Sequence, residues 1–161
     1  MPAPEELSDP AIVIATGVSI ERDFALDVTQ YKLVSLVFRE LTDLRVTIDK
    51  IVYVPTLEAP PDRPYPFVYF ITIDNQSPET VTIRGRKWVI TDQLGQKIVV
   101  EGDGVVGEFP HLRPGERFSY NSYHVIGTDS AAEGAFIGIS DQGPFIVRIP
   151  RFEMRVPTKH G

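Results

Sequence analysis

The chain has 161 residues, which is the usual length of one domain. Its 42% of hydrophobic and 24% of charged residues exclude a disordered tail, and no apolar run approaches the ~18 residues of a membrane-spanning helix. The formal net charge of −6 argues against a general nucleic-acid binder, because contacts with phosphates need a basic surface. The absence of cysteine excludes disulfides, thiolate metal sites and cysteine nucleophiles. We therefore expect a soluble cytoplasmic protein that uses no cofactor and binds neither nucleic acid nor a membrane.

The first 45 residues differ from the rest of the chain. Residues 2–10 are rich in proline and glutamate, and further along apolar residues recur at spacings of three and four, which is typical of one face of a helix. These positions are Phe24, Val28, Tyr31, Val34, Phe38 and Leu41. We predict an N-terminal extension, residues 1–45, with a helix at 22–44 that packs against the rest of the protein or a second copy. A strand at residues 32–38 is the alternative.

From residue 45 onward, segments rich in β-branched and aromatic residues alternate with turn signals. The connections include a proline-rich loop at residues 55–66, a hairpin turn at 92–95 and a loop of small residues at 129–134. The strands are expected at residues 45–54, 67–73, 80–91, 97–101, 117–124 and 135–140, and in a last segment after residue 144. Their number and spacing predict an all-β protein, with an antiparallel β-sandwich of the immunoglobulin-like or fibronectin type III-like kind over residues 46–161.

The longest candidate strand changes its hydrophobic phase. Val81 and Ile83 are apolar at odd positions, whereas Trp88 and Ile90 are apolar at even ones. Successive side chains of a strand point to opposite faces, so an uninterrupted strand cannot bury both sets. We predict a bulge at Gly85 that brings both sets to one face.

The last segment changes phase in the same way. Its apolar residues stand at odd positions within residues 145–149 and at even positions within residues 152–156, with Pro150 at the switch. Proline has no amide hydrogen to donate to a neighbouring strand, so we predict a kink or a strand break at Pro150.

A glycine-rich loop at residues 102–108 matches the G-x-G-x-x-G pattern of dinucleotide-binding proteins. That mode needs a helix that starts at the loop and holds the pyrophosphate with its N-terminal amides. Here Pro110, Pro114 and Gly115 follow the loop, and they would prevent such a helix. We therefore interpret the segment as a structural loop. Its candidate ligand-binding residues are Gly102, Asp103, Gly104, Gly107 and Glu108.

Three carboxylates, those of Glu101, Asp103 and Glu108, lie in or beside this loop. They could hold a hard cation such as Mg²⁺, which prefers oxygen ligands, and they would repel a phosphate. Three acids lack the dense ligand pattern of a dedicated cation site, so a solvated acidic loop is the favoured interpretation. The sequence identifies no particular metal.

The one basic cluster next to a large aromatic residue consists of Arg84, Arg86, Lys87 and Trp88. Such a cluster could bind a phosphate group or an acidic partner. The favoured alternative is a solvated strand edge with Trp88 in the core, because large aromatic side chains are mostly buried.

No arrangement of residues in the sequence indicates an enzyme. The histidines, His111, His124 and His160, have no spacing that would let two imidazoles hold one metal ion. His124 has the same parity as Phe118 and Tyr120, so it is expected along the face of a strand. The nucleophile motif G-x-S-x-G is also absent from the sequence. We predict that the protein has no catalytic residues.

A strand (YPFVYFITIDN, residues 65–75), a glycine loop (EGDGVVGEFP, residues 101–110) and a Pro-Gly turn (LRPGERFSY, residues 112–120) follow one another in the chain. Together with shorter motifs they resemble the ApaG domain family over about residues 46–161. The shorter motifs are at residues 86–92, 149–152 and 156–158. The sequence departs from the family pattern at residues 121–124, where the family commonly has Thr-Ser-Gly, and at residues 127–133, which lack a Thr-Pro-x-Gly character.

The resemblance implies a fibronectin type III-like or immunoglobulin-like sandwich. Stand-alone bacterial ApaG proteins are associated with cobalt resistance and magnesium efflux without an established enzymatic step. Similar eukaryotic domains occur in an F-box protein and in a protein that binds a DNA polymerase. We therefore expect a non-catalytic binding module that recognises a partner protein, whose identity the sequence does not give, and a homodimer is a further expectation. A sensor of small ligands or divalent cations that uses residues 102–108 is the alternative.

Overall fold

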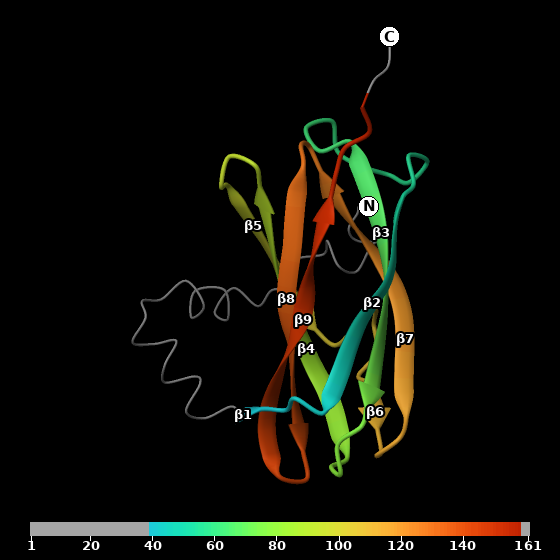
Figure 1. The fold of residues 1–161 in the computed structure, drawn as a ribbon, viewed down its shortest axis with the longest axis vertical. Coiled ribbons are helices and arrows are strands. Elements are labelled where there is room, and N and C mark those ends of the chain that lie inside the picture. The colour runs from blue at the N-terminus through green and yellow to red at the C-terminus, as the bar shows by residue number, and fades with distance from the viewer. Residues whose placement is uncertain (1–38, 159–161) are drawn as a thin grey trace.

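The computed structural model describes residues 39–158, which form nine β-strands and their connections (Figure 1). The strands are β1 (Arg39–Glu40), β2 (Leu44–Tyr53), β3 (Tyr65–Asn75), β4 (Val81–Asp92), β5 (Lys97–Asp103), β6 (His111–Leu112), β7 (Arg117–Ile126), β8 (Ser130–Ser140) and β9 (Gly143–Met154). The all-β prediction is therefore confirmed. Within this part of the chain, no helix is long and apolar enough to cross a membrane.

The nine strands form two sheets. The six-stranded sheet has the order β1-β9-β8-β4-β5, with β6 paired to β4, and the three-stranded sheet has the order β2-β3-β7. The sheets face each other as a two-layer sandwich, with β2, β3 and β7 on one side and β4, β5, β8 and β9 on the other (Figure 1). The strand pairs are antiparallel except for the short pair of β1 and β9, which is parallel.

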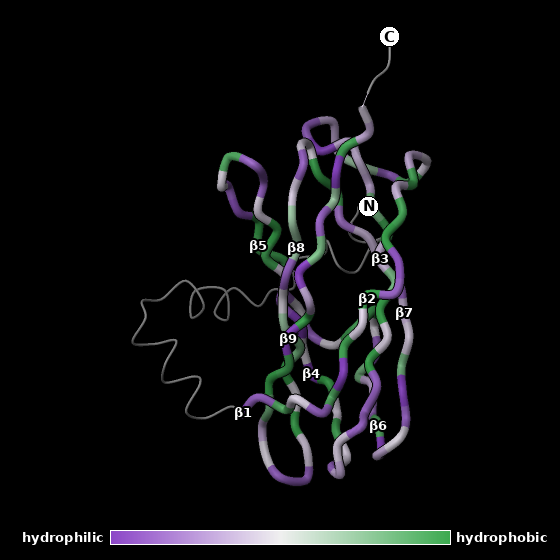
Figure 2. The backbone as a smooth tube through the Cα atoms, viewed as in Figure 1, coloured by the Kyte–Doolittle hydropathy of each residue, from purple (hydrophilic) through white to green (hydrophobic). Residues whose placement is uncertain are grey.

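The hydrophobic core lies between the two sheets. Trp88 on β4 and Phe136 on β8 are fully buried there, and the Trp88 ring lies 5.0 Å from the ring of Tyr69 on β3. Figure 2 shows hydrophobic residues interspersed with hydrophilic ones along the strands, the alternation that lets each sheet bury one face. Each large apolar side chain buried in this way contributes about 1.5–3 kcal/mol. The core position favoured for Trp88 is therefore the one observed.

Both phase changes predicted from the sequence are present. The register of β4 against β8 shifts between Ile83 and Gly85, and this bulge turns the even-numbered residues after Gly85 toward the core. The register of β8 against β9 shifts opposite Pro150, which is exposed, and β9 continues on both sides of the shift. Pro150 has no amide hydrogen to donate to β8, so the pairing between the two strands is interrupted there, while β9 itself continues.

The prediction that a helix at residues 22–44 continues to residue 44 is wrong. Arg39 and Glu40 form β1, and Leu41 and Leu44 are buried in the sandwich core. The spacing of three between these leucines fits a helix, but here it belongs to a tight turn in which the Leu44 amide donates to the Leu41 carbonyl oxygen over 3.2 Å. Residues 22–38 of the predicted helix, and the alternative strand at 32–38, lie outside the described residues.

The prediction of a loop of small residues at 129–134 is also wrong, because β8 begins at Ser130. A Cβ atom added to Gly134 would lie 2.2 Å from the carbonyl oxygen of Lys87 on β4. The small residues therefore mark a close approach of two strands, where a larger side chain would collide with the neighbouring backbone.

Candidate functional site

The glycine loop, residues 102–108, connects β5 to the segment before β6 as a tight hairpin. The Val105 amide donates to the Glu108 carbonyl oxygen over 2.8 Å, and the Glu108 amide donates to the Val105 carbonyl oxygen over 2.9 Å. No helix follows Gly107, so the loop lacks the N-terminal amides that a dinucleotide site requires. The structural interpretation of the loop is the one that its geometry supports.

Positive φ angles give this hairpin its shape. Gly104 has a φ of +63° and Gly107 a φ of +82°, values that glycine adopts readily. A Cβ atom at Gly104 would lie 2.4 Å from the Glu108 carbonyl oxygen, so there is also no room for a side chain at this position. Val106 has a φ of +43°, which is unusual for a β-branched residue and costs about 1–2 kcal/mol. The loop is therefore a strained, closely fitted turn.

Arg86 on β4 holds the glycine loop in place with side-chain hydrogen bonds. Its side chain is buried, and Nη1 donates to the carbonyl oxygens of Asp103 (3.0 Å) and Gly104 (3.2 Å). The Gly104 amide in turn donates to the Arg84 carbonyl oxygen over 2.8 Å. Hydrogen bonds from a charged donor are stronger than those between neutral groups, so β4 holds the loop in one position.

An exposed aromatic ring stands next to this anchored loop. Phe109 follows the loop directly, and 53% of its surface remains exposed. The guanidinium carbon of Arg84, which is exposed, lies 5.7 Å from the centre of the Phe109 ring. This is the geometry of a cation–π contact, and it holds the ring and the guanidinium side by side on the surface. We name Arg84 and Phe109 the Phe109 surface.

The predicted basic-aromatic cluster does not form one surface. Arg84 is exposed and Lys87 is half-buried, whereas Arg86 is buried and Trp88 has none of its surface exposed. The bulge before Gly85 explains this separation, because it reverses which residues of β4 face the core. Of the four, only Arg84 belongs to the Phe109 surface.

The three carboxylates do not converge either. Glu101 is buried and pairs in register with Lys87 across β4 and β5, while Asp103 and Glu108 are exposed. Within residues 39–158, no group of three or more His, Cys, Asp or Glu side chains is placed to hold a metal ion.

The two described histidines take different positions. His111 is exposed, with Nδ1 2.8 Å from the Thr82 hydroxyl oxygen. His124 lies on the inner face of β7 with none of its surface exposed, between the rings of Tyr69 and Trp88. Burial, and after it the charge of Arg86, lowers the pKa of His124 to about 3. His124 is therefore a neutral core residue at physiological pH.

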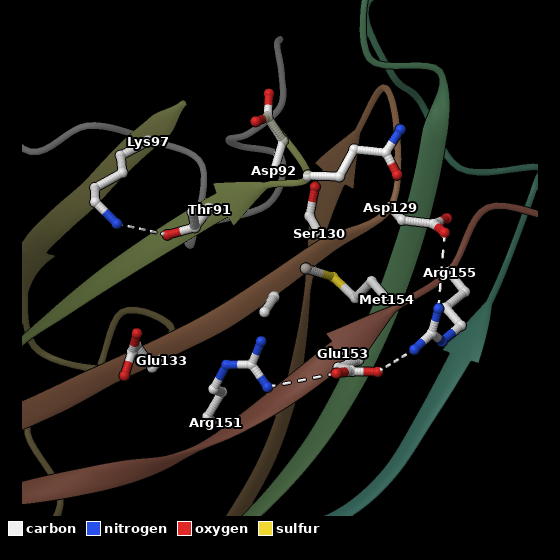
Figure 3. Close-up of a pocket in the computed structure, with 12 residues that line it drawn as sticks. Thr91, Asp92, Lys97, Asp129, Ser130, Glu133, Arg151, Glu153, Met154 and Arg155 are labelled. Atoms are coloured by element: carbon white, nitrogen blue, oxygen red, sulfur yellow. Dashed lines mark hydrogen bonds and ion pairs between the residues drawn. The ribbon is translucent and has the colours of Figure 1, made fainter. Parts of the chain in front are cut away.

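A hollow of about 380 Å³ lies where the end of β4 and the start of β5 meet β8 and the end of β9 (Figure 3). Its two arginines pair with neighbouring carboxylates. Arg155 pairs with Glu153 (2.7 Å) and with Asp129 (3.8 Å), and Arg151 pairs with Glu153 (3.5 Å). Lys97 donates to the Thr91 hydroxyl over 3.1 Å. Both arginines of the hollow are engaged by carboxylates, so it is a weaker candidate than the Phe109 surface.

Sequence reasoning did not single out Phe109. The signal was a lone aromatic residue between Glu108 and Pro110 in a polar turn, a place where no strand pattern would bury it.

The ApaG domain model matches residues 55–138 of this chain. The chain belongs to the ApaG domain family.

Relatives named Protein ApaG support this membership over most of their length. The protein of Acidithiobacillus ferrooxidans is 38% identical over 119 residues, which cover 73% of this chain and 93% of that protein. The protein of Methylococcus capsulatus is 37% identical over 123 residues, which cover 75% of this chain and 97% of that protein. The crystal structure of the ApaA protein of Bordetella pertussis matches with a TM-score of 0.64 and 34% identity, covering 73% of this chain and 96% of that chain.

The family match includes the whole candidate site. Arg84, Arg86, Phe109 and the glycine loop all lie within residues 55–138. About a quarter of this chain lies outside the alignment with each ApaG relative. The candidate site thus belongs to the part of the chain that is shared with ApaG proteins.

Proposed function

We propose that this ApaG protein is a non-catalytic binding module that recognises a partner protein through the Phe109 surface. The observation that carries the proposal is an aromatic ring with 53% of its surface exposed on a loop that buried hydrogen bonds hold in place. Aromatic residues and arginine are enriched at protein interfaces, and arginine is also enriched among the residues that dominate binding energy. Arg84 and Phe109 present one of each.

The rigidity of the loop supports the same function. Binding costs free energy when flexible side chains and loops become ordered at an interface. Here the hairpin bonds of residues 105 and 108, and the Arg86 bonds to residues 103 and 104, fix the loop before any partner arrives. A partner that contacts Phe109 therefore bears little of the ordering cost.

The alternative function is a sensor of small ligands or divalent cations at residues 102–108, in keeping with the family association with cobalt and magnesium. Asp103 and Glu108 offer two exposed carboxylates to such a ligand, while Glu101 is buried on β5. The two functions differ in a simple measurement. A ligand raises the melting temperature by mass action, so millimolar Mg²⁺ or Co²⁺ shifts the melting curve of a sensor and leaves that of a protein adaptor unchanged.

The test of protein recognition compares Phe109→Ala with Leu94→Ala. Leu94 is exposed by 79% at the turn between β4 and β5, and it serves as a control for the loss of any exposed apolar residue. Proteins that the immobilised wild type captures from the native host would be identified, purified and measured for affinity. We expect Phe109→Ala to weaken binding by about 30-fold or more, and Leu94→Ala to leave it unchanged. Unchanged affinity of Phe109→Ala at a wild-type melting temperature would contradict the proposal.

Further parts of the proposal concern the setting of the module. The fibronectin type III-like class of the sandwich is an expectation that fits the two-sheet architecture. The cytoplasmic location and the homodimer are expectations from the sequence. Light scattering during size-exclusion chromatography measures the oligomeric state, and a strictly monomeric mass at high protein concentration would contradict the homodimer.

A further inference from the structure

The strand β5 forms one edge of the six-stranded sheet (Figure 1). Within residues 39–158 it pairs with β4 alone, and the register of this pair is unbroken from Lys97 to Asp103. The strand also contains no proline. Edge strands are templates for pairing with another chain, and bulges or prolines are common means of blocking them. Because β5 has neither, it can accept a further strand.

Hydrogen bonds at the two ends of the β4–β5 pair show which backbone groups of β5 point outward. The Asp92 amide donates to the Gln96 carbonyl oxygen over 2.9 Å, and the Gly104 amide donates to the Arg84 carbonyl oxygen over 2.8 Å. In an antiparallel pair, hydrogen-bonded and non-hydrogen-bonded residue pairs alternate, so the even-numbered residues of β5 bond to β4. The amides of odd-numbered residues such as Val99 therefore point away from β4.

The residues of β5 are complementary to themselves in one antiparallel register. When Lys97 lies opposite Asp103 of a second copy, Val100 lies opposite Val100, and residues 97–103 are paired throughout. Lys97 and Asp103 are both exposed and both odd-numbered, so they meet on the same face of the joined sheet. Opposite charges directly across two strands stabilise the pair, and two-fold symmetry forms this ion pair twice.

Registers shifted by two residues are less favourable. A shift in one direction places Glu101 opposite Glu101 of the second copy, where like charges repel each other. A shift in the other direction leaves Gly102 and Asp103 without opposite residues and places Lys97 opposite Glu101, which is buried. Charge and length therefore select the register that is centred on Val100.

The edges of the three-stranded sheet offer no comparable match. β7 is an edge strand with an unshifted register, but its only residue that is charged at neutral pH is Arg117, which pairs with Asp74. Two copies of β7 would therefore bring no opposite charges together. The other edge, β2, has a bulge between Ile48 and Lys50. Among these three strands, β5 is the one suited to a second copy.

We propose that two copies of the chain pair along β5 and join their six-stranded sheets into one continuous sheet. This proposal rests on the homodimer proposed above and names its surface. Ile98, with 37% of its surface exposed, lies in this register opposite Gly102, which has no side chain to collide with it. The Asp103 carbonyl oxygen already accepts from Arg86, so the Asp103 amide supplies the hydrogen bond at that end of the pair.

The test of the register reverses the two charges separately. In Lys97→Glu and in Asp103→Lys, each dimer would contain two like-charged pairs in place of two ion pairs. We expect each variant alone to dimerise about tenfold more weakly, or worse, in analytical ultracentrifugation. In an equimolar mixture of the two variants, each introduced charge faces an opposite charge, so we expect a mixed dimer of about wild-type affinity. A general defect of folding would not be repaired by mixing.

A second variant tests the backbone hydrogen bonds. Val99→Pro removes an amide that points away from β4, a place where an edge strand tolerates proline. The matched control is Asn121→Pro at an exposed position of β7, where the Asn75 amide bond to the Glu116 carbonyl oxygen shows that even-numbered residues pair with β3. We expect Val99→Pro to be monomeric at concentrations where the wild type and Asn121→Pro are dimers.

The outcomes separate this proposal from the proposed function. A wild type that stays monomeric at high concentration would overturn both the homodimer and its surface. A dimer that resists the charge reversals and Val99→Pro would overturn only the use of β5, and so would weak single variants that fail to form a mixed dimer. If Val99→Pro does not fold, the mixed dimer alone decides. Partner recognition through the Phe109 surface is measured independently of these results.

Discussion

The guanidinium of Arg86 donates a 3.2 Å hydrogen bond to the carbonyl oxygen of Gly104, and this bond couples two irregular features of the fold. The bulge in β4 before Gly85 turns Arg86 away from solvent, and the glycine loop presents two carbonyl oxygens to it. Without the bulge, Arg86 would point outward, and the carbonyls of Asp103 and Gly104 would lose their charged donor. The irregularity in one strand therefore fixes the shape of the candidate site.

Replacing Arg86 with methionine removes this donor while keeping a long apolar side chain. The carbonyl oxygens of Asp103 and Gly104 then lose their bonds to Nη1, and an unsatisfied buried polar group costs about 1–3 kcal/mol. We expect Arg86→Met to lower the free energy of unfolding by about 2–4 kcal/mol in urea. The control Arg84→Met, at an exposed position, removes only the cation–π contact with Phe109 and should lower it by at most about 1 kcal/mol. Equal effects of the two substitutions would refute the anchoring role of Arg86.

Alanine substitutions at two glycines of the loop should have different effects. Both Gly104 and Gly107 have positive φ, so each substitution pays about 1–2 kcal/mol for the left-handed conformation. At Gly104 the new Cβ atom would also collide with the Glu108 carbonyl oxygen at 2.4 Å, whereas at Gly107 no atom lies within 4 Å. We therefore expect Gly104→Ala to lower the melting temperature several degrees more than Gly107→Ala does. Calorimetry measures the difference, and equal melting temperatures would argue against the tight fit.

The strands could be predicted because their signal is periodic along the chain. The phase changes around Gly85 and Pro150 followed from the rule that neighbouring side chains face opposite ways, and both occur at the expected places. Apolar spacing alone could not distinguish a helix from a turn at Leu41 and Leu44, because the same spacing of three also places two leucines of a turn in the sandwich core. Only the tertiary packing decides between these two structures.

The candidate site was less accessible to sequence reasoning. The glycine loop could be identified from its pattern, since prolines after it exclude a helix. Whether Arg84 or Arg86 faces solvent depends on which residues the bulge separates, and that is set by the pairing of β4 with β8. The exposure of Phe109 likewise depends on the fold of the loop beneath it.

The stability of the protein should depend on pH through His124. Its pKa is about 3 in the folded protein, because of burial and then the charge of Arg86, against an ordinary value of 6.5 when the chain is unfolded. Between these values the unfolded state binds one more proton than the folded state. Stability from this residue is therefore complete above pH 6.5 and falls by about 1.4 kcal/mol for each unit as pH decreases toward 3.

The substitution His124→Phe should remove this part of the pH dependence. Neither ring nitrogen of His124 has a hydrogen-bond partner within residues 39–158, so an apolar ring of similar size loses no bond there. Rings of Tyr69 at 4.7 Å and Trp88 at 4.8 Å already form an aromatic environment. Urea unfolding of both proteins between pH 7 and 5 measures the difference. Parallel pH profiles for wild type and variant would show that His124 does not titrate in this way.

The attachment of β1 should depend on the ion pair between Arg39 and Glu79. Arg39 donates to both carboxylate oxygens of Glu79, and the Ser140 hydroxyl donates to one of them over 2.6 Å. The bond from Arg39 lowers the pKa of Glu79 below its ordinary value of 4.5, so this contribution to stability is present above pH 4.5 and is lost as the pH falls below it. The Arg39 side chain is 44% exposed, so the pair is worth at most about 1 kcal/mol.

We expect the substitution Glu79→Gln to act locally on β1. The Leu41 amide donates to β9 immediately after β1, so its hydrogen exchange reports the attachment of this short strand. A loss of about 1 kcal/mol corresponds to an exchange rate about five times faster at Leu41. The control Arg117→Ala removes a 3.3 Å pair with Asp74 on the other sheet and should leave exchange at Leu41 unchanged. If Glu79→Gln and Arg117→Ala give the same exchange rate at Leu41, the ion pair does not hold β1 in place.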